Sequence, residues 1–301
     1  METMLNLGCG SRFHQDWINV DFASTGEGVI AHNLLQGIPF SDCHFDAVYH
    51  SHVLEHFSKE AAPRFLEECF RVLKPGGIIR IAVPDLEQIA REYLKNLEGA
   101  LADDEKSVLN YDWIMVELYD QTVRETSGGA YGYYWGQEQV PNEDYMVQRM
   151  GYEYRNARKA YHESKKHQAA DTKIALATEK LPASPPVNRF LKPSTYINRI
   201  KKRFLKADLE MITRLKQELH AQMQTEAAYA QLGRFRRNGE IHQWMYDRFS
   251  LKRLLETVGF GSVQQTTAYE SRLPSWNSYE LDTENGEVRK PDSLFMEAVK
   301  I

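Results

Sequence analysis

Four histidines stand where an imidazole group could carry out chemistry. His50, His52 and His56 lie close together behind an apolar segment, and His242 lies far along the chain. Imidazole changes its charge near neutral pH, so a histidine can remove the proton of a reacting hydroxyl group. We therefore rank His52, then His242, then His56 as candidate catalytic bases. A purely structural role for each of them is the alternative.

The spacing His50-x-His52-x3-His56 also raises the question of a metal ion. Histidine nitrogens bind zinc, but the end of a strand does not obviously bring three rings to one point. A closed zinc site also needs a fourth ligand. The sequence therefore predicts no metal ion here.

A second candidate site begins with Gly8 and Gly10, which follow an apolar run. Glycine lets a ligand approach the backbone closely, and Asp21 farther on could accept both hydroxyl groups of a ribose. A dinucleotide-binding loop would need a third glycine followed by a full helix, but Phe13 stands at that position. The alternative is an ordinary turn beside a solvated Asp21.

Five segments occur in a fixed order along the first part of the chain. They are LNLGCGS at 5–11, Asp21, IPFSDCHFD at 38–46, HVLEH at 52–56 and RVLKPGG at 71–77. Together they resemble the class I S-adenosylmethionine-dependent methyltransferases of the broad type 11 kind. The resemblance covers about residues 4–85 and, more weakly, 240–300. It implies methyl transfer as the reaction and S-adenosyl-L-methionine as the cofactor.

The resemblance also implies which residues hold the cofactor. They are Gly8 and Gly10 under the methionine part, Asp21 on the ribose, Asn33 and Leu34 beside the adenine, and His50 and Ser51 near the sulfonium and the amino-acid end. Because no full helix follows the loop and the family's acid in the first strand is missing, Arg12 could hold the carboxylate instead. Two positions depart from the family pattern, because Asn6 replaces the acid of the first strand and Asn33 replaces an acid near the adenine. An amide at position 33 could still bond to the adenine edge.

The C-terminal part bears on the methyl acceptor. The segments GEIHQWMYD at 239–247 and KPDSLF at 290–295 look like the end of bacterial methyltransferases often encoded with cell-surface polysaccharide genes. This resemblance implies O-methylation of a small molecule or a surface-glycan sugar. N-methylation, or a catalytically silent scaffold protein that binds S-adenosylmethionine, stays open as an alternative.

The elements that must position these residues follow from the apolar pattern. Strands are expected at 4–7, 17–21, 28–31, 45–49, 78–83, 263–268 and 293–299. Residues 59–73 have helical spacing, and a later helix should begin with Ser250 as its cap and end at Gly259. The pattern predicts an α/β, Rossmann-like fold with a mostly parallel seven-stranded sheet. The first crossover has room for barely one helical turn.

The expected methyltransferase core comprises residues 1–85 and 241–301, and residues 86–240 form a large, mainly helical insertion after the fifth strand. An aromatic cluster at 131–135 could be a platform for substrate or could simply pack the insertion on the core.

The insertion is also locally basic. Residues 149–206 carry fifteen basic and four acidic side chains in a protein of net charge −5. Residues 196–206 read as a basic amphipathic helix that could contact a membrane surface. Packing on the core or in a homo-oligomer is the alternative.

Composition limits the remaining function classes. The net charge of −5 and a pI near 6.1 argue against a nucleic-acid partner. The first residues do not resemble a signal peptide, and no apolar run reaches the roughly 18 residues of a spanning helix. The three cysteines have neither disulfide nor zinc spacing. We expect a cytoplasmic protein, or one held peripherally at the inner face of the membrane.

Overall fold

The computed structural model describes residues 2–164, 223–236 and 239–301. The chain divides into two compact units, Met1–Glu163 with Gly239–Ile301, and Ser164–Asn238. Of the second unit, residues 223–235 are described as a helix whose side chains are mostly exposed.

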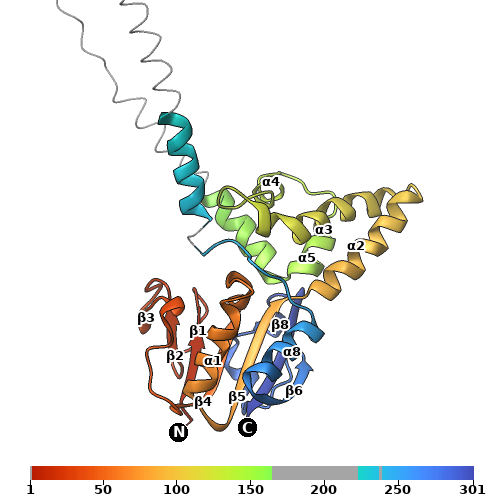
Figure 1. Cartoon of the computed structure of the whole chain (residues 1–301). Helices are drawn as coiled ribbons and strands as arrows, with labels where there is room; N and C mark the ends of the chain where they lie inside the picture. Colours follow the sequence, from red (N-terminus) through yellow and green to blue (C-terminus); the bar gives the residue numbers. More distant parts are fainter. Residues whose placement is uncertain (1, 165–222, 237–238) are drawn as a thin grey trace, which may run out of the picture. The chain divides into compact units, whose positions relative to one another are not determined.

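A seven-stranded sheet forms the centre of the first unit, in the order β3-β2-β1-β4-β5-β9-β6 (Figure 1). Its strands are β1 Met4–Leu7, β2 Ile18–Asp21, β3 Val29–Ala31, β4 Phe45–Ser51, β5 Leu73–Pro84, β6 Phe260–Thr266 and β9 Ser293–Lys300. The first five strands pair in parallel, and β9 runs antiparallel between β5 and β6. The mostly parallel seven-stranded sheet predicted from the apolar pattern is confirmed.

Two helices, α1 Ala62–Val72 and α8 Arg248–Val258, pack on one face of this sheet (Figure 1). Their buried side chains join those of β1, β4 and β5 in the largest hydrophobic cluster. This is the expected result of apolar residues placed three and four apart on a helix.

The start of α8 corrects the sequence prediction. Asp247, not Ser250, is the cap, since its side chain accepts bonds from the backbone N–H of Phe249 and Ser250. The Ser250 hydroxyl accepts the N–H of Asp247 in return, which completes a capping box. The end of α8 is as predicted, because Gly259 takes the left-handed conformation with φ of 111°.

No helix lies between β1 and β2, where the loop runs as short turns. The opposite sheet face is covered instead by the segment between β6 and β9, which includes η3 Trp276–Tyr279, β7 Thr283–Glu284 and β8 Glu287–Val288. Arg80 of β5 is fully buried under it, paired with Asp282 at 2.7 Å and Glu297 at 2.8 Å. This network fixes the C-terminal segment to the sheet.

The helical insertion begins directly after β5. It contains α2 Leu86–Leu101, α3 Glu105–Val123, α4 Tyr131–Trp135 and α5 Glu143–Met150. All seven sheet strands lie within residues 1–85 and 241–301. The first compact unit extends to Glu163, so it includes the helices α2 to α5 as well. Most of the basic stretch, including 196–206, lies outside the described residues. No helix in the described part of the chain is long and apolar enough to cross a membrane.

Candidate functional site

Two cavities open near the carboxyl ends of β1, β4 and β5, where a parallel sheet binds its ligands. We call the first the glycine-loop cavity; it measures about 230 Å³ and its lining includes Gly8, Gly10, Arg12 and Ser51. We call the second the histidine cavity; it measures about 210 Å³ and its lining includes His52, His56 and His242. Lys290 lines both, so the two cavities adjoin.

The loop after β1 requires its glycines. Gly8 has a φ of +62°, and a Cβ added there would lie 2.3 Å from Cγ2 of Val53. Gly10 has a φ of +53° and nothing within 4 Å of an added Cβ, so its backbone faces open space. The N–H of Gly10 donates to a carboxylate oxygen of Asp21 at 2.7 Å. The loop is therefore tied to the end of β2.

Positive side chains gather around the glycine-loop cavity. Its wall includes Arg12, Arg289 and Lys290, with Glu153 as the acidic residue. Arg12 pairs with Glu284, and Arg289 pairs with Glu153. Burial and the nearby Arg289 lower the pKa of Arg12. The sequence indicated Arg12 only, because nothing local shows that positions 289 and 290 return to the loop after β1.

The structure places one of the remaining predicted cofactor residues in the glycine-loop cavity and the others outside both cavities. Ser51, the last residue of β4, lines the glycine-loop cavity. Asp21 at the end of β2 and the residues Asn33 and Leu34 line neither of the two cavities. Asn33 caps the short helix η1 Leu34–Gln36 by accepting the N–H of Leu35 at 3.0 Å. These three residues lie along the β2 and β3 side of the same sheet edge.

His50 is placed differently from its expected position near the sulfonium. Its side chain is fully buried, its ring meets Phe65 of α1 at 5.2 Å, and it lines neither cavity. Burial lowers the pKa of His50 to about 4. Side chains alternate along β4, so Tyr49 and Ser51 reach the cavity while His50 points to the helices.

His52 is held at both ring nitrogens. Its Nδ1 lies 3.1 Å from Oε1 of Glu55, and its Nε2 lies 2.8 Å from the hydroxyl oxygen of Ser293 at the start of β9. Glu55 is completely buried. Burial alone would raise the pKa of Glu55, but His52, His242 and His56 around it hold that pKa below its usual range. The result is a chain of contacts Glu55–His52–Ser293, of which His52 lines the histidine cavity.

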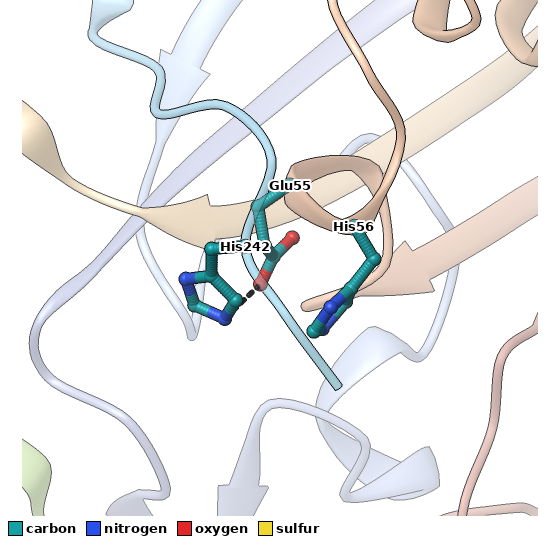
Figure 2. A group of neighbouring side chains, drawn as sticks. All are labelled: Glu55, His56 and His242. Atoms are coloured by element: carbon teal, nitrogen blue, oxygen red, sulfur yellow. Dashed lines mark ion pairs between the residues drawn. The ribbon is translucent and has the colours of Figure 1, made fainter. Parts of the chain in front are cut away.

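The other two candidate bases meet at the same carboxylate (Figure 2). Nε2 of His242 lies 3.9 Å from Oε1 of Glu55, and the His242 and His56 rings are nearly perpendicular with centroids 4.8 Å apart. His242 is buried, which lowers its pKa to about 3.

Backbone bonds bring His242 to this place. The carbonyl of Glu55 accepts the N–H groups of Gln243 at 2.7 Å and Trp244 at 3.2 Å. The side chain of Gln243 donates to the carbonyl of His56 at 2.8 Å. The segment that rejoins the core is thus clamped onto η2 Leu54–His56. All three predicted bases come together, with Glu55 as an organising residue that the sequence did not reveal.

The aromatic cluster of the insertion is mainly packing. Tyr131 lines the histidine cavity, whereas Tyr134 and Trp135 pack against a buried cluster around Trp113. Tyr133 is 70% exposed. Of the rings in the aromatic cluster at 131–135, that of Tyr131 lines the histidine cavity.

Comparison with known proteins identifies the domain. Residues 19–81 match the family model of a methyltransferase domain. The match supports a methyltransferase domain in this part of the chain, and the matched residues include His52, Glu55 and His56. The glycine loop precedes the match, and His242 and Lys290 follow it.

One curated relative matches a short part of the chain. It is a protein of Mycolicibacterium smegmatis named "Probable S-adenosylmethionine-dependent methyltransferase/", 39% identical over 56 residues, which are 19% of this chain. The chain covers 21% of the length of that relative.

Solved structures are similar to this chain at low sequence identity. A SAM-dependent methyltransferase from Archaeoglobus fulgidus is 13% identical over 99% of this chain and 86% of its own, with a TM-score of 0.35. A Burkholderia thailandensis 1,6-didemethyltoxoflavin-N1-methyltransferase with bound S-adenosylhomocysteine is 20% identical over 28% of this chain and 45% of its own, with a TM-score of 0.24.

Proposed function

We propose that this chain transfers a methyl group from S-adenosyl-L-methionine to a hydroxyl oxygen of a small molecule or a surface-glycan sugar. The observation that supports this most is the adjacency of the two cavities. The glycine-loop cavity suits the cofactor, the histidine cavity suits the acceptor, and Lys290 is common to both.

The residues of the glycine-loop cavity fit the methionine end of the cofactor. Gly10 leaves open space against its backbone, and Arg12, Arg289 and Lys290 supply positive charge for a carboxylate. The ribose and the adenine would extend toward Asp21, Asn33 and Leu34 at the neighbouring strand ends. S-adenosylmethionine supplies the methyl group on a positively charged sulfur. The chain's own part is to align the two reactants and to remove a proton.

His52 is the proposed base. A carboxylate at Nδ1 favours the tautomer with its proton on Nδ1, which leaves the lone pair on Nε2 free to accept a proton. Glu55 lies at Nδ1, and the Ser293 hydroxyl lies at Nε2. An acceptor hydroxyl that took the place of the Ser293 hydroxyl would lie within hydrogen-bond distance of the base. His242 and His56 support the geometry around Glu55.

The acceptor side is polar. Besides the histidines, the histidine cavity is lined by Gln121, Lys290 and Asp292, with the ring of Tyr131 on its wall. Hydroxyl-rich acceptors such as sugars bind through hydrogen bonds to groups of this kind and by packing on an aromatic ring. This lining favours a hydroxylated acceptor.

The test is transfer of a labelled methyl group. The full chain is incubated with methyl-labelled S-adenosylmethionine and fractions of a bacterial lysate, including surface-glycan extracts. We expect a labelled product whose methyl group NMR assigns to an oxygen. A methyl group on nitrogen would overturn the oxygen assignment. Cofactor binding without any labelled product would instead support a silent scaffold protein.

A further inference from the structure

Glu55, His56 and His242 form a group of potential metal-ligand side chains, of which His56 and His242 line the histidine cavity. One potential ligand atom from each lies within 4.8 Å of the other two. Two imidazole nitrogens and one carboxylate oxygen are the protein ligands of many catalytic zinc sites. Bonds of about 2.0–2.1 Å in a tetrahedron separate ligand atoms by about 3.4 Å, so small side-chain rotations would close the site. Figure 2 shows the three side chains directed toward one another.

The carboxylate at the centre lacks the hydrogen bonds that its burial demands. Glu55 has no exposed surface; its Oε1 lies 3.1 Å from Nδ1 of His52, and in the described part of the chain its Oε2 has no hydrogen-bond partner. A buried carboxylate is costly unless a cation or donors compensate it. A metal ion would compensate the remaining oxygen.

A second acidic side chain, on the wall of the histidine cavity, also favours a cation. Asp292 lines the histidine cavity, and its Oδ1 is also buried without a hydrogen-bond partner among the described residues. Lys290 is the basic residue of the lining, so the cavity is not positive overall. Two acidic side chains that each have a buried oxygen without a hydrogen-bond partner among the described residues favour a cation at this place.

The surroundings hold the ligands in place. Nδ1 of His56 lies 3.2 Å from the carbonyl oxygen of Ile241, which fixes the proton on Nδ1 and leaves Nε2 free for a metal. The backbone bonds from Gln243 and Trp244 to Glu55 fix the approach of the neighbouring His242. Outer contacts of this kind orient metal ligands in known sites.

From these contacts we propose that Glu55, His56 and His242 bind a divalent transition-metal ion such as zinc, with an open coordination position toward the histidine cavity. The sequence predicts no metal from His50, His52 and His56, because a strand end does not obviously bring three rings to one point. The structure places His50 in the core and brings His242 beside His56 instead. Metal binding stands on these contacts alone. If hydroxyl methylation also holds, an ion here would polarise the acceptor oxygen.

The test measures binding without cofactor or acceptor. Untagged full-length chain is stripped with a chelator and titrated with zinc chloride by calorimetry, and with cobalt chloride by visible absorption. We expect one ion per chain and a cobalt spectrum of low coordination number. His56→Ala and Glu55→Gln should each weaken zinc binding by at least about 100-fold, since loss of outer contacts alone costs about 10–100-fold.

The matched control is His44→Ala, which removes an exposed histidine outside both cavities. It should leave zinc affinity unchanged. His56→Ala is the main variant because His56 is only half-buried, and circular dichroism checks that each variant is folded. The proposal would be overturned if folded His56→Ala and Glu55→Gln variants bound zinc as tightly as the original chain. It would also be overturned if His44→Ala weakened zinc binding as well. Methyl transfer plays no part in this readout, so the two proposals fail separately.

Discussion

At the scale of single residues, His52 owes its proposed role to its two neighbours. Glu55 at Nδ1 and Ser293 at Nε2 hold the ring in one orientation at the cavity wall. Nε2 of His242 lies farther from Glu55, at 3.9 Å, and its burial disfavours the charged form that a base acquires when it accepts a proton. Geometry therefore favours His52 over His242, in the order that the sequence predicts.

Replacing His52 should separate catalysis from cofactor binding. We expect His52→Gln to lower turnover by about 100-fold or more, because general-base catalysis contributes about 10²–10⁴-fold, while cofactor affinity stays nearly unchanged. Steady-state rates and calorimetry on the same preparation measure both quantities. His44→Gln serves as the control and should keep both. Near-normal turnover of His52→Gln would mean that alignment alone, or another group, carries the reaction.

At the scale of elements, the loop after β1 depends on the close approach of η2. A methyl group at position 8 would meet Val53, whereas a methyl group at Gly28, which has a φ of +84°, would meet nothing within 4 Å. The two glycines therefore share a backbone conformation but differ in crowding.

Gly8→Ala should destabilise the fold more than Gly28→Ala. Left-handed backbone alone costs about 1–2 kcal/mol for an ordinary residue, and overlap with Val53 adds about 1–3 kcal/mol. Denaturant unfolding of both variants measures the difference. The double variant Gly8→Ala with Val53→Ala should recover part of the added loss relative to Val53→Ala alone. Equal losses for Gly8→Ala and Gly28→Ala would contradict the close contact.

Elements were easier to predict from the sequence than the contacts between them. Buried parallel strands are short apolar runs, so the sequence predicts β1, β4 and β5 as strands. The orientation of His50 was not, because a shift of one residue along a strand moves a side chain to the other face. The meeting of Glu55 with His242 joins residues far apart in the chain, and no local pattern records it. The cap of α8 was misplaced by one turn because Asp247 and Ser250 are both good caps.

At the scale of the whole molecule, the basic stretch at 149–206 remains a sequence prediction, since most of it lies outside the described residues. Its charge contrasts with the net −5 of the chain. Each basic residue near an anionic lipid surface contributes about 1 kcal/mol to the free energy of binding, and salt screens this attraction. The chain should therefore sediment with anionic vesicles at low salt, and less at high salt or with neutral vesicles. No anionic preference at low salt would direct attention to an oligomer interface or a charged acceptor.

The central claim for the whole molecule is that the sheet edge binds S-adenosylmethionine, and calorimetry on the full chain tests it most directly. We expect one S-adenosylmethionine or S-adenosylhomocysteine per chain and no binding of NAD. Asp21→Ala should weaken binding by about 1.5–3 kcal/mol, roughly 10- to 150-fold, through loss of a charge-assisted hydrogen bond. Asp21→Asn can still accept the Gly10 N–H, so it tests the loss of charge without the loss of that hydrogen bond. Asp16→Ala removes an exposed acid nearby and should leave the affinity for S-adenosylmethionine unchanged. Binding of NAD, or an Asp21→Ala variant with unchanged affinity for S-adenosylmethionine, would contradict the account.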